Sequence, residues 1–121
     1  MTTNSTFLAI FLGSKTSSRM AAWNALAEAE RQKKTQEGIA AWKGWIEKHQ
    51  ASIVVIGGPL CKTKKISSNG IEDISNAMGA FTLVNADSHE AAAKIFENHP
   101  HFTHFPGDSI EVMPVLPIPD A

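Results

Sequence analysis

Four short apolar runs, at residues 6–12, 53–56, 81–84 and 110–116, divide the chain. Each is bounded by glycine, proline or polar residues, which is typical of buried β-strands. The first is rich in Phe, Leu and Ile and ends at Gly13, and the second stops at Gly57-Gly58-Pro59. The last run contains Pro114, and two further prolines follow it, so we expect it at an edge of the sheet.

Between the first two runs the apolar spacing becomes helical. Met20 and Trp23 recur at this spacing, and Ile39, Trp42 and Trp45 do so again after Gly38. Residues 17–49 are therefore predicted to form two helices, or one bent helix interrupted near Gly38.

The segment 62–74 is polar and contains a Ser-Asn-Gly turn at residues 68–70, which predicts a short hairpin. A second helix signal follows the third strand, where Asp87 and Glu90 have capping-box spacing. The helix that they open is expected to end at Pro100.

This order of elements predicts an α+β fold, a ferredoxin-like antiparallel sheet with its helices on one face. At 121 residues the chain has room for one such domain, spanning residues 1–121. The strands are apolar enough to leave a large hydrophobic patch on the other face. A second copy of the chain, related by a two-fold axis, is the simplest cover, so we expect a homodimer.

Composition and charge limit the kinds of partner that we expect for this chain. The formal charge is −1, and nucleic acid binding needs concentrated positive charge, so nucleic acid is not expected as a partner. Small basic clusters around Lys34 and Lys64 are read as solvated surface, with anion binding as the alternative. The apolar run at residues 7–12 is too short to span a membrane, and a lone cysteine, Cys61, fits a reducing compartment. We therefore expect a cytoplasmic protein with no membrane partner.

Several loose motifs occur in an order that resembles a known family. They are Trp42-Lys-Gly-Trp45, Gly57-Gly-Pro-Leu60, Gly79-Ala-Phe-Thr-Leu-Val84, Asp87-Ser-His-Glu-Ala91 and the closing Ile110-Glu-Val-Met-Pro-Val115. In this order they resemble the YCII-related (DGPF) proteins of the dimeric α+β barrel superfamily. The resemblance implies a barrel-like homodimer with a small-molecule pocket between sheet and helices. In some members it also implies an acid–base role for a histidine and an aspartate.

Two positions depart from the family pattern. Trp42, which cannot exchange protons, aligns where some members carry a helix histidine. The Asp-Gly-Pro-Phe motif is replaced by residues 70–75, which retain the acidic pair Glu72 and Asp73. Asp73 is a catalytic candidate only through this place in the family pattern.

The most unusual chemistry lies in residues 99–104, where His99, His101 and His104 fall within one short segment predicted as a loop. Imidazoles titrate near neutrality and bind metals. The spacing matches no zinc signature, so no cofactor or metal is predicted, and metal binding by this cluster stays open as an alternative. Acid–base or ligand contact by His99 or His101 competes with a plain loop whose histidines cap and pack.

Glu111 is a further catalytic candidate because it lies within an otherwise apolar strand. An ion pair across a dimer is the alternative reading. Candidate ligand contacts come from aromatic side chains and from the end of the histidine cluster: Trp42, Trp45, Phe81 and His104. For the two tryptophans, core packing is the competing interpretation.

No phosphate loop, nucleophile elbow or dinucleotide fingerprint occurs. The sequence therefore predicts a dimeric small-molecule-binding protein. One form of this prediction is a cofactor-independent lyase or isomerase acting on a small organic acid or aromatic compound. A non-catalytic binding protein and a purely structural dimer remain open.

Overall fold

The computed structural model describes residues 5–119. Its strands are β1 (Ser5–Leu12), β2 (Ile53–Pro59), β3 (Thr63–Ser67), β4 (Gly70–Ile74), β5 (Met78–Ala86) and β6 (Ser109–Pro114). Its helices are α1 (Ser18–Ala25), α2 (Glu28–Lys48), α3 (His89–Ile95) and α4 (Pro100–Thr103).

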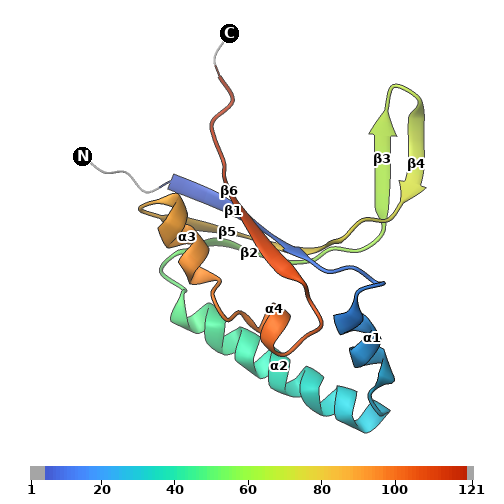
Figure 1. Ribbon diagram of the computed structural model, residues 1–121. Coiled ribbons are helices and arrows are strands. Elements are labelled where there is room, and N and C mark those ends of the chain that lie inside the picture. The colour runs from blue at the N-terminus through green and yellow to red at the C-terminus, as the bar shows by residue number, and fades with distance from the viewer. Residues whose placement is uncertain (1–4, 120–121) are drawn as a thin grey trace.

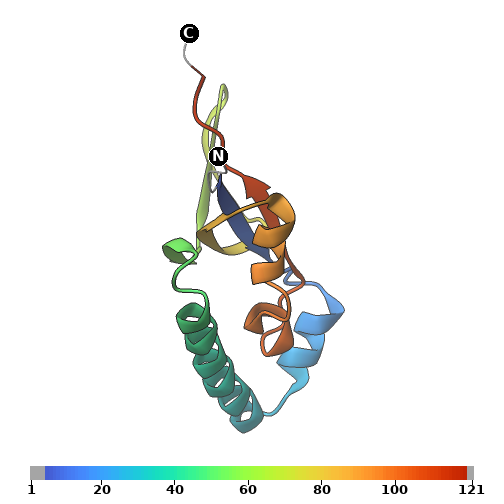
Figure 2. The ribbon, with the colours of Figure 1, turned by 90° about the vertical axis from the view of Figure 1, so that its left-hand side faces the viewer.

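Four strands form one antiparallel sheet in the order β2-β5-β1-β6, and β3 pairs only with β4. The helices lie on one side of this sheet, whereas the β3–β4 hairpin extends on the other side, as Figures 1 and 2 show. This confirms the predicted α+β, ferredoxin-like arrangement with helices on one face.

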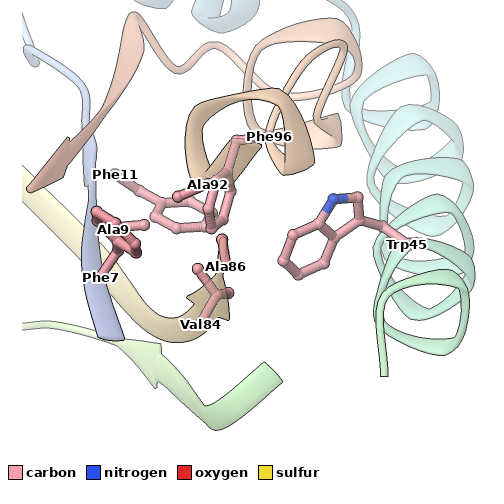
Figure 3. Packing of buried hydrophobic residues seen from close by; sticks show 8 residues of the cluster. All are labelled: Phe7, Ala9, Phe11, Trp45, Val84, Ala86, Ala92 and Phe96. Atoms are coloured by element: carbon pink, nitrogen blue, oxygen red, sulfur yellow. The ribbon is translucent and has the colours of Figure 1, made fainter. Parts of the chain in front are cut away.

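Side chains alternate along each strand between the two faces of the four-stranded sheet. Phe7, Ala9 and Phe11 of β1 are buried on the helix side, together with Val84 and Ala86 of β5. The core is completed by Ala92 of α3, Phe96 at its end and Trp45 of α2 (Figure 3). The helix face of the sheet therefore carries the hydrophobic core.

The opposite face of the four-stranded sheet, here called the open face, carries the alternate residues. Leu8 pairs with Leu83 of β5 and with Met113 of β6, and Ile10 pairs with Phe81 and Glu111. Partners in a ladder point to the same face, so three apolar side chains and the Glu111 carboxylate surround Leu8 and Ile10 there. No helix of the described chain covers them (Figure 1).

The segment between the first two strands forms two helices, as one of the two alternatives predicted. The break lies at Leu26 and Ala27, however, and α2 runs without interruption through Gly38, so the expected interruption there is wrong. Gly38 is buried because Phe105 packs on it: a Cβ atom would lie 2.6 Å from two carbons of that ring. The close approach of Phe105, and not a bend in α2, therefore explains why a glycine occupies this position in the helix.

Three boundaries also differ from expectation. β2 continues through Gly57, where φ is +71° and a Cβ atom would lie 2.0 Å from the Phe81 carbonyl oxygen. Ser88 caps α3 in place of Asp87, its hydroxyl accepting a hydrogen bond from the Ala91 amide at 3.0 Å. Pro100 begins α4 instead of ending the preceding helix, since proline fits the first turn of a helix. The predicted hairpin is confirmed over residues 63–74.

Within residues 5–119, none of the helices combines the length and apolar character that a membrane crossing requires.

Candidate functional site: an imidazole enclosed by aromatic rings

His99 occupies the layer between the sheet and α2. It is the N-cap of α4, and its ring Nδ1 accepts a hydrogen bond from the His101 amide at 2.9 Å. The preceding residue, Asn98, has φ of +57°, a left-handed conformation that asparagine tolerates. The histidine segment predicted as a loop is therefore a tight turn followed by a short helix, and the turn directs His99 inward.

Three aromatic rings enclose this imidazole. Its centroid lies 4.5 Å from Trp42 and 4.5 Å from Trp45, both on α2, and 4.9 Å from Phe11 on β1. The His99 ring is perpendicular to those of Trp42 and Phe11, with interplanar angles of 89°. His99 has 0% exposure, so its polar atoms have no access to solvent.

Burial decides the charge of His99. It lowers the pKa of this imidazole to about 3, with smaller contributions in the same direction from His101 and His49. The ring is therefore neutral near pH 7, and because Nδ1 accepts a hydrogen bond, its proton lies on Nε2.

The Nε2 atom of His99 is buried and has no hydrogen-bond partner within residues 5–119. An unsatisfied buried donor costs roughly 1–3 kcal/mol, part of which contact with aromatic faces recovers. A group held at such a cost is a candidate for contact with a ligand.

His101 lies beside this site but is bound to the backbone. Its Nε2 is 2.8 Å from the Leu12 carbonyl oxygen, and its ring centroid is 5.3 Å from that of Phe11. Burial lowers the pKa of His101, while the carbonyl groups of Leu12 and Ser109 and the carboxylate of Asp108 act in the opposite direction. The ring joins α4 to the end of β1.

The structure brings together four of the residues singled out from the sequence: His99, His101, Trp42 and Trp45. Trp45 is also fixed by its indole, which donates a hydrogen bond to the Ile95 carbonyl at 2.9 Å. Both tryptophans therefore pack in or against the core and also lie beside His99, and their contact with a ligand stays a prediction.

The other candidates lie elsewhere. Glu111 and Phe81 both pair with Ile10 on the open face, across the sheet from His99. Asp73 is exposed on the hairpin and forms an ion pair with Lys64 at 2.6 Å. His104 turns outward toward α1, and its Nδ1 lies 2.9 Å from the Thr103 hydroxyl. Consequently the three imidazoles do not converge, and within residues 5–119 no three His, Cys, Asp or Glu side chains are grouped as a metal site requires.

Sequence reasoning missed three members of this region. Phe11 and Phe96 were assigned only to a strand and a helix, yet their rings face His99. Gly107 was not singled out, although a Cβ atom there would collide with the His101 ring at 2.3 Å. A glycine six residues after a histidine forms no recognisable sequence motif, so the contact between Gly107 and His101 is found only in the folded structure.

Comparison with known proteins agrees with this architecture. No family model matches the chain, and no curated protein matches it. A solved structure is similar: 5-chloro-2-hydroxyhydroquinone dehydrochlorinase (TftG) from Burkholderia phenoliruptrix AC1100, in complex with 2,5-dihydroxybenzoquinone. The match covers 89% of this chain and 90% of that one, with 18% identity and a TM-score of 0.51. This likeness shows the fold.

Proposed function

We propose that this chain is a small-molecule-binding protein of the YCII-like, dimeric α+β barrel kind. In this proposal His99 donates a hydrogen bond from Nε2 to an oxygen of a small planar ligand. The observation that carries the proposal is the buried, unpartnered Nε2–H enclosed by Phe11, Trp42 and Trp45. Ligand sites commonly combine such apolar walls with one or a few placed polar groups.

The ligand class follows from the chemistry of the site. Aromatic walls favour a flat ring, and a neutral N–H donor favours a carbonyl or hydroxyl oxygen over a cation. A compound bearing both features, such as a hydroxylated quinone, lies in the structure of the similar dehydrochlorinase. Ring compounds with carbonyl or phenolic oxygens are therefore the first ligands to test.

The lowered pKa of His99 limits the chemistry available to it. An imidazole with a pKa of about 3 is a weak base near pH 7, but its neutral form can polarise a carbonyl group. A lyase or isomerase reaction would need a second group to move the proton, and the candidate is His101, whose backbone amide donates a hydrogen bond to His99 Nδ1. Binding without catalysis is the second candidate, favoured by the hydrogen bonds that occupy Nδ1 of His99 and Nε2 of His101.

Access to His99 requires a side chain to move, because its ring is fully buried. Trp42 is the half-buried member of the aromatic enclosure, and Phe105 lies against its outer side with ring centroids 6.1 Å apart. Rotation of Trp42 would open the site toward α1 without breaking the Trp45 hydrogen bond. We therefore expect ligand binding to change the environment of Trp42 more than that of Trp45.

The proposal includes a homodimer formed through the open face. Support comes from the paired apolar residues Leu8, Leu83 and Met113 on that face, which a monomer would leave without cover. A Leu83→Glu substitution would place a carboxylate in the centre of the interface, so light scattering after size exclusion should report a monomer. Ile39→Glu, on an exposed position of α2, is the control and should remain dimeric. A monomeric wild type would contradict the dimer.

Binding itself can be tested by calorimetry with 2,5-dihydroxybenzoquinone and related phenols on wild type, His99→Phe and His104→Asn. His99→Phe keeps an aromatic ring but removes the donor, and loss of one hydrogen bond to a ligand oxygen should weaken binding by at least about 3-fold. His104→Asn should bind like wild type, because His104 lies outside the aromatic enclosure. Equal affinity in wild type and His99→Phe would overturn the proposal.

A further inference from the structure

A second concave surface lies on the outer side of the helices. Figures 1 and 2 show α4 between α1 and α2. The hollow at this junction has a volume of about 290 Å³ and is here called the α1–α4 groove. Its principal lining side chains are Arg19, Trp23, Leu26, Lys34, His104 and Phe105. The aromatic neighbours of the His99 ring are Phe11, Trp42, Trp45 and Phe96, none of which lines the groove. The groove therefore has a different lining from the site described above and adjoins it through the Trp42–Phe105 contact.

The charged side chains of the α1–α4 groove are all of one sign. Arg19 and Lys34 line it from two helices, and no carboxylate does so. Neither residue forms an ion pair with any group in the described part of the chain. Because the whole chain has a formal charge of −1, this positive character is local rather than a consequence of composition.

Arg19 is also held in place. Its guanidinium Nη2 donates a hydrogen bond to the carbonyl oxygen of Phe102 on α4, which fixes one end of the fork. The other N–H groups remain able to bind an anion, and an arginine that is already ordered loses less entropy on binding. Lys34 lies on α2, so an anion in the groove would be contacted from both sides.

The groove has an aromatic floor. The Trp23 and Phe105 ring centroids are 6.0 Å apart with an interplanar angle of 49°, and both side chains are half-buried. Phe105 is seated against Gly38, where any side chain would displace it. The floor is therefore built by specific packing, and it offers apolar surface next to the two cations.

A neighbouring hollow provides an internal comparison. It has a volume of about 450 Å³, shares Trp23, and is lined otherwise by polar residues of α2 that include Glu28 and Arg31. Its two charges are of opposite sign, and it lacks a second aromatic ring. Of these two hollows, the α1–α4 groove is the one that combines two unpaired cations with two aromatic rings.

We infer that the α1–α4 groove binds a small aromatic anion, a carboxylate or a phosphate monoester on a single ring. The ring would lie on Trp23 and Phe105 while Arg19 and Lys34 contact the anionic group. A volume of about 290 Å³ is close to the lower end, roughly 300 Å³, of pockets that hold small molecules, which suits one ring rather than a larger ligand. Charge-assisted hydrogen bonds from arginine would supply the selectivity for an anion.

Three probes of similar shape test this inference by calorimetry and by the indole NH signal of Trp23 in NMR spectra. They are benzoate, phenyl phosphate and the neutral benzyl alcohol. At least one anion should bind, about tenfold or more tightly than benzyl alcohol, and should shift the Trp23 signal. Binding of benzoate alone identifies a carboxylate site, and binding of phenyl phosphate alone a phosphate site. Equal binding of all three, or of none, would overturn the inference.

Substitutions locate the site. Arg19→Gln and Lys34→Gln, both at exposed positions, should each weaken binding of the anion several-fold and reduce its dependence on salt. Arg31→Gln in the neighbouring hollow is the matched control and should bind like wild type. His99→Phe should leave anion binding unchanged, so the groove and the His99 site succeed or fail separately. Unchanged affinity in both Arg19→Gln and Lys34→Gln would contradict the assignment.

Discussion

Gly107 lies directly against the imidazole of His101. A Cβ atom at Gly107 would come within 2.3 Å of Cε1 and Nε2 of that ring, the same Nε2 that contacts the Leu12 carbonyl. The Gly107 amide in turn donates a hydrogen bond to the His101 carbonyl at 2.9 Å. The glycine and the histidine thus form one packed unit that joins α4 to β1.

A Gly107→Ala substitution should therefore displace His101. We expect a loss of about 1–3 kcal/mol in the free energy of unfolding, because the methyl group overpacks a buried position. Urea denaturation measures this loss. Gly13→Ala is the control: its Cβ would meet the nearest atom at 3.7 Å, an ordinary contact, and the effect should be much smaller. Equal stability of Gly107→Ala and wild type would show that the ring is free to move.

Two glycines of α2 give a matched pair. A Cβ atom at Gly38 would lie 2.6 Å from Phe105, whereas at Gly44 it would meet nothing within 4 Å. Alanine is favoured over glycine inside a helix by about 1 kcal/mol, so Gly44→Ala should stabilise the protein. Gly38→Ala should instead be neutral or destabilising, because overpacking costs roughly 1–3 kcal/mol. Thermal unfolding of both variants tests the contrast, and stabilisation by Gly38→Ala would contradict the packing of Phe105.

The indole of Trp45 should stabilise the fold through its hydrogen bond as well as through the burial of its apolar surface. Trp45→Phe leaves the Ile95 carbonyl without its 2.9 Å donor and removes buried volume, so we expect a loss of about 2–4 kcal/mol. Trp23→Phe is the comparison, since the Trp23 indole makes no hydrogen bond within residues 5–119 and is half-buried. A similar loss for both variants would mean that the Trp45 hydrogen bond adds nothing to stability.

Acidification should destabilise the fold through His99. Its pKa is about 3 in the folded protein and near 6.5 in an unfolded chain, so the unfolded state binds more protons between these values. The contribution of His99 is fully present above pH 6.5. As the pH falls from 6.5 toward 3 it is lost by up to about 1.4 kcal/mol per pH unit. Burial shifts His101 in the same direction.

Urea denaturation of wild type and His99→Phe at pH 7, 6 and 5 isolates this effect, because contributions from the carboxylates are common to both proteins. The stability advantage of wild type should shrink, or reverse, as the pH falls. Parallel pH profiles would show that His99 is not held neutral by the fold.

The sequence predicted the fold well because apolar periodicity is a local signal. The runs around Phe11 and Val84 became strands, and Trp42 and Trp45 became one helix face, as their spacing indicated. The ends of the helices were less predictable. Glycine can interrupt a helix or lie within one, as Gly38 does, and proline can follow a helix or begin one, as Pro100 does. Gly38 accommodates Phe105, which is distant in sequence, and only the fold shows that contact.

Residue type alone selected part of the candidate site. His99, Trp42 and Trp45 were chosen by residue type, and packing of α2 against α4 brought them together. Glu111 could not be placed correctly relative to His99, because strand alternation gives its face only after the register with Ile10 is known. Phe11 appeared to be an ordinary strand residue, and its contact with His99 depends on the turn at Asn98.

The central claim is that the Nε2–H of His99 serves a ligand, and histidine ¹⁵N NMR tests it most directly. Without ligand, the spectrum near pH 7 should show a neutral His99 with its proton on Nε2. Addition of 2,5-dihydroxybenzoquinone, or of a phenol that binds by calorimetry, should shift Nε2 of His99 while leaving the His104 signals nearly unchanged. A bound ligand that leaves Nε2 of His99 unshifted, or a His99 that is charged near pH 7, would contradict the account.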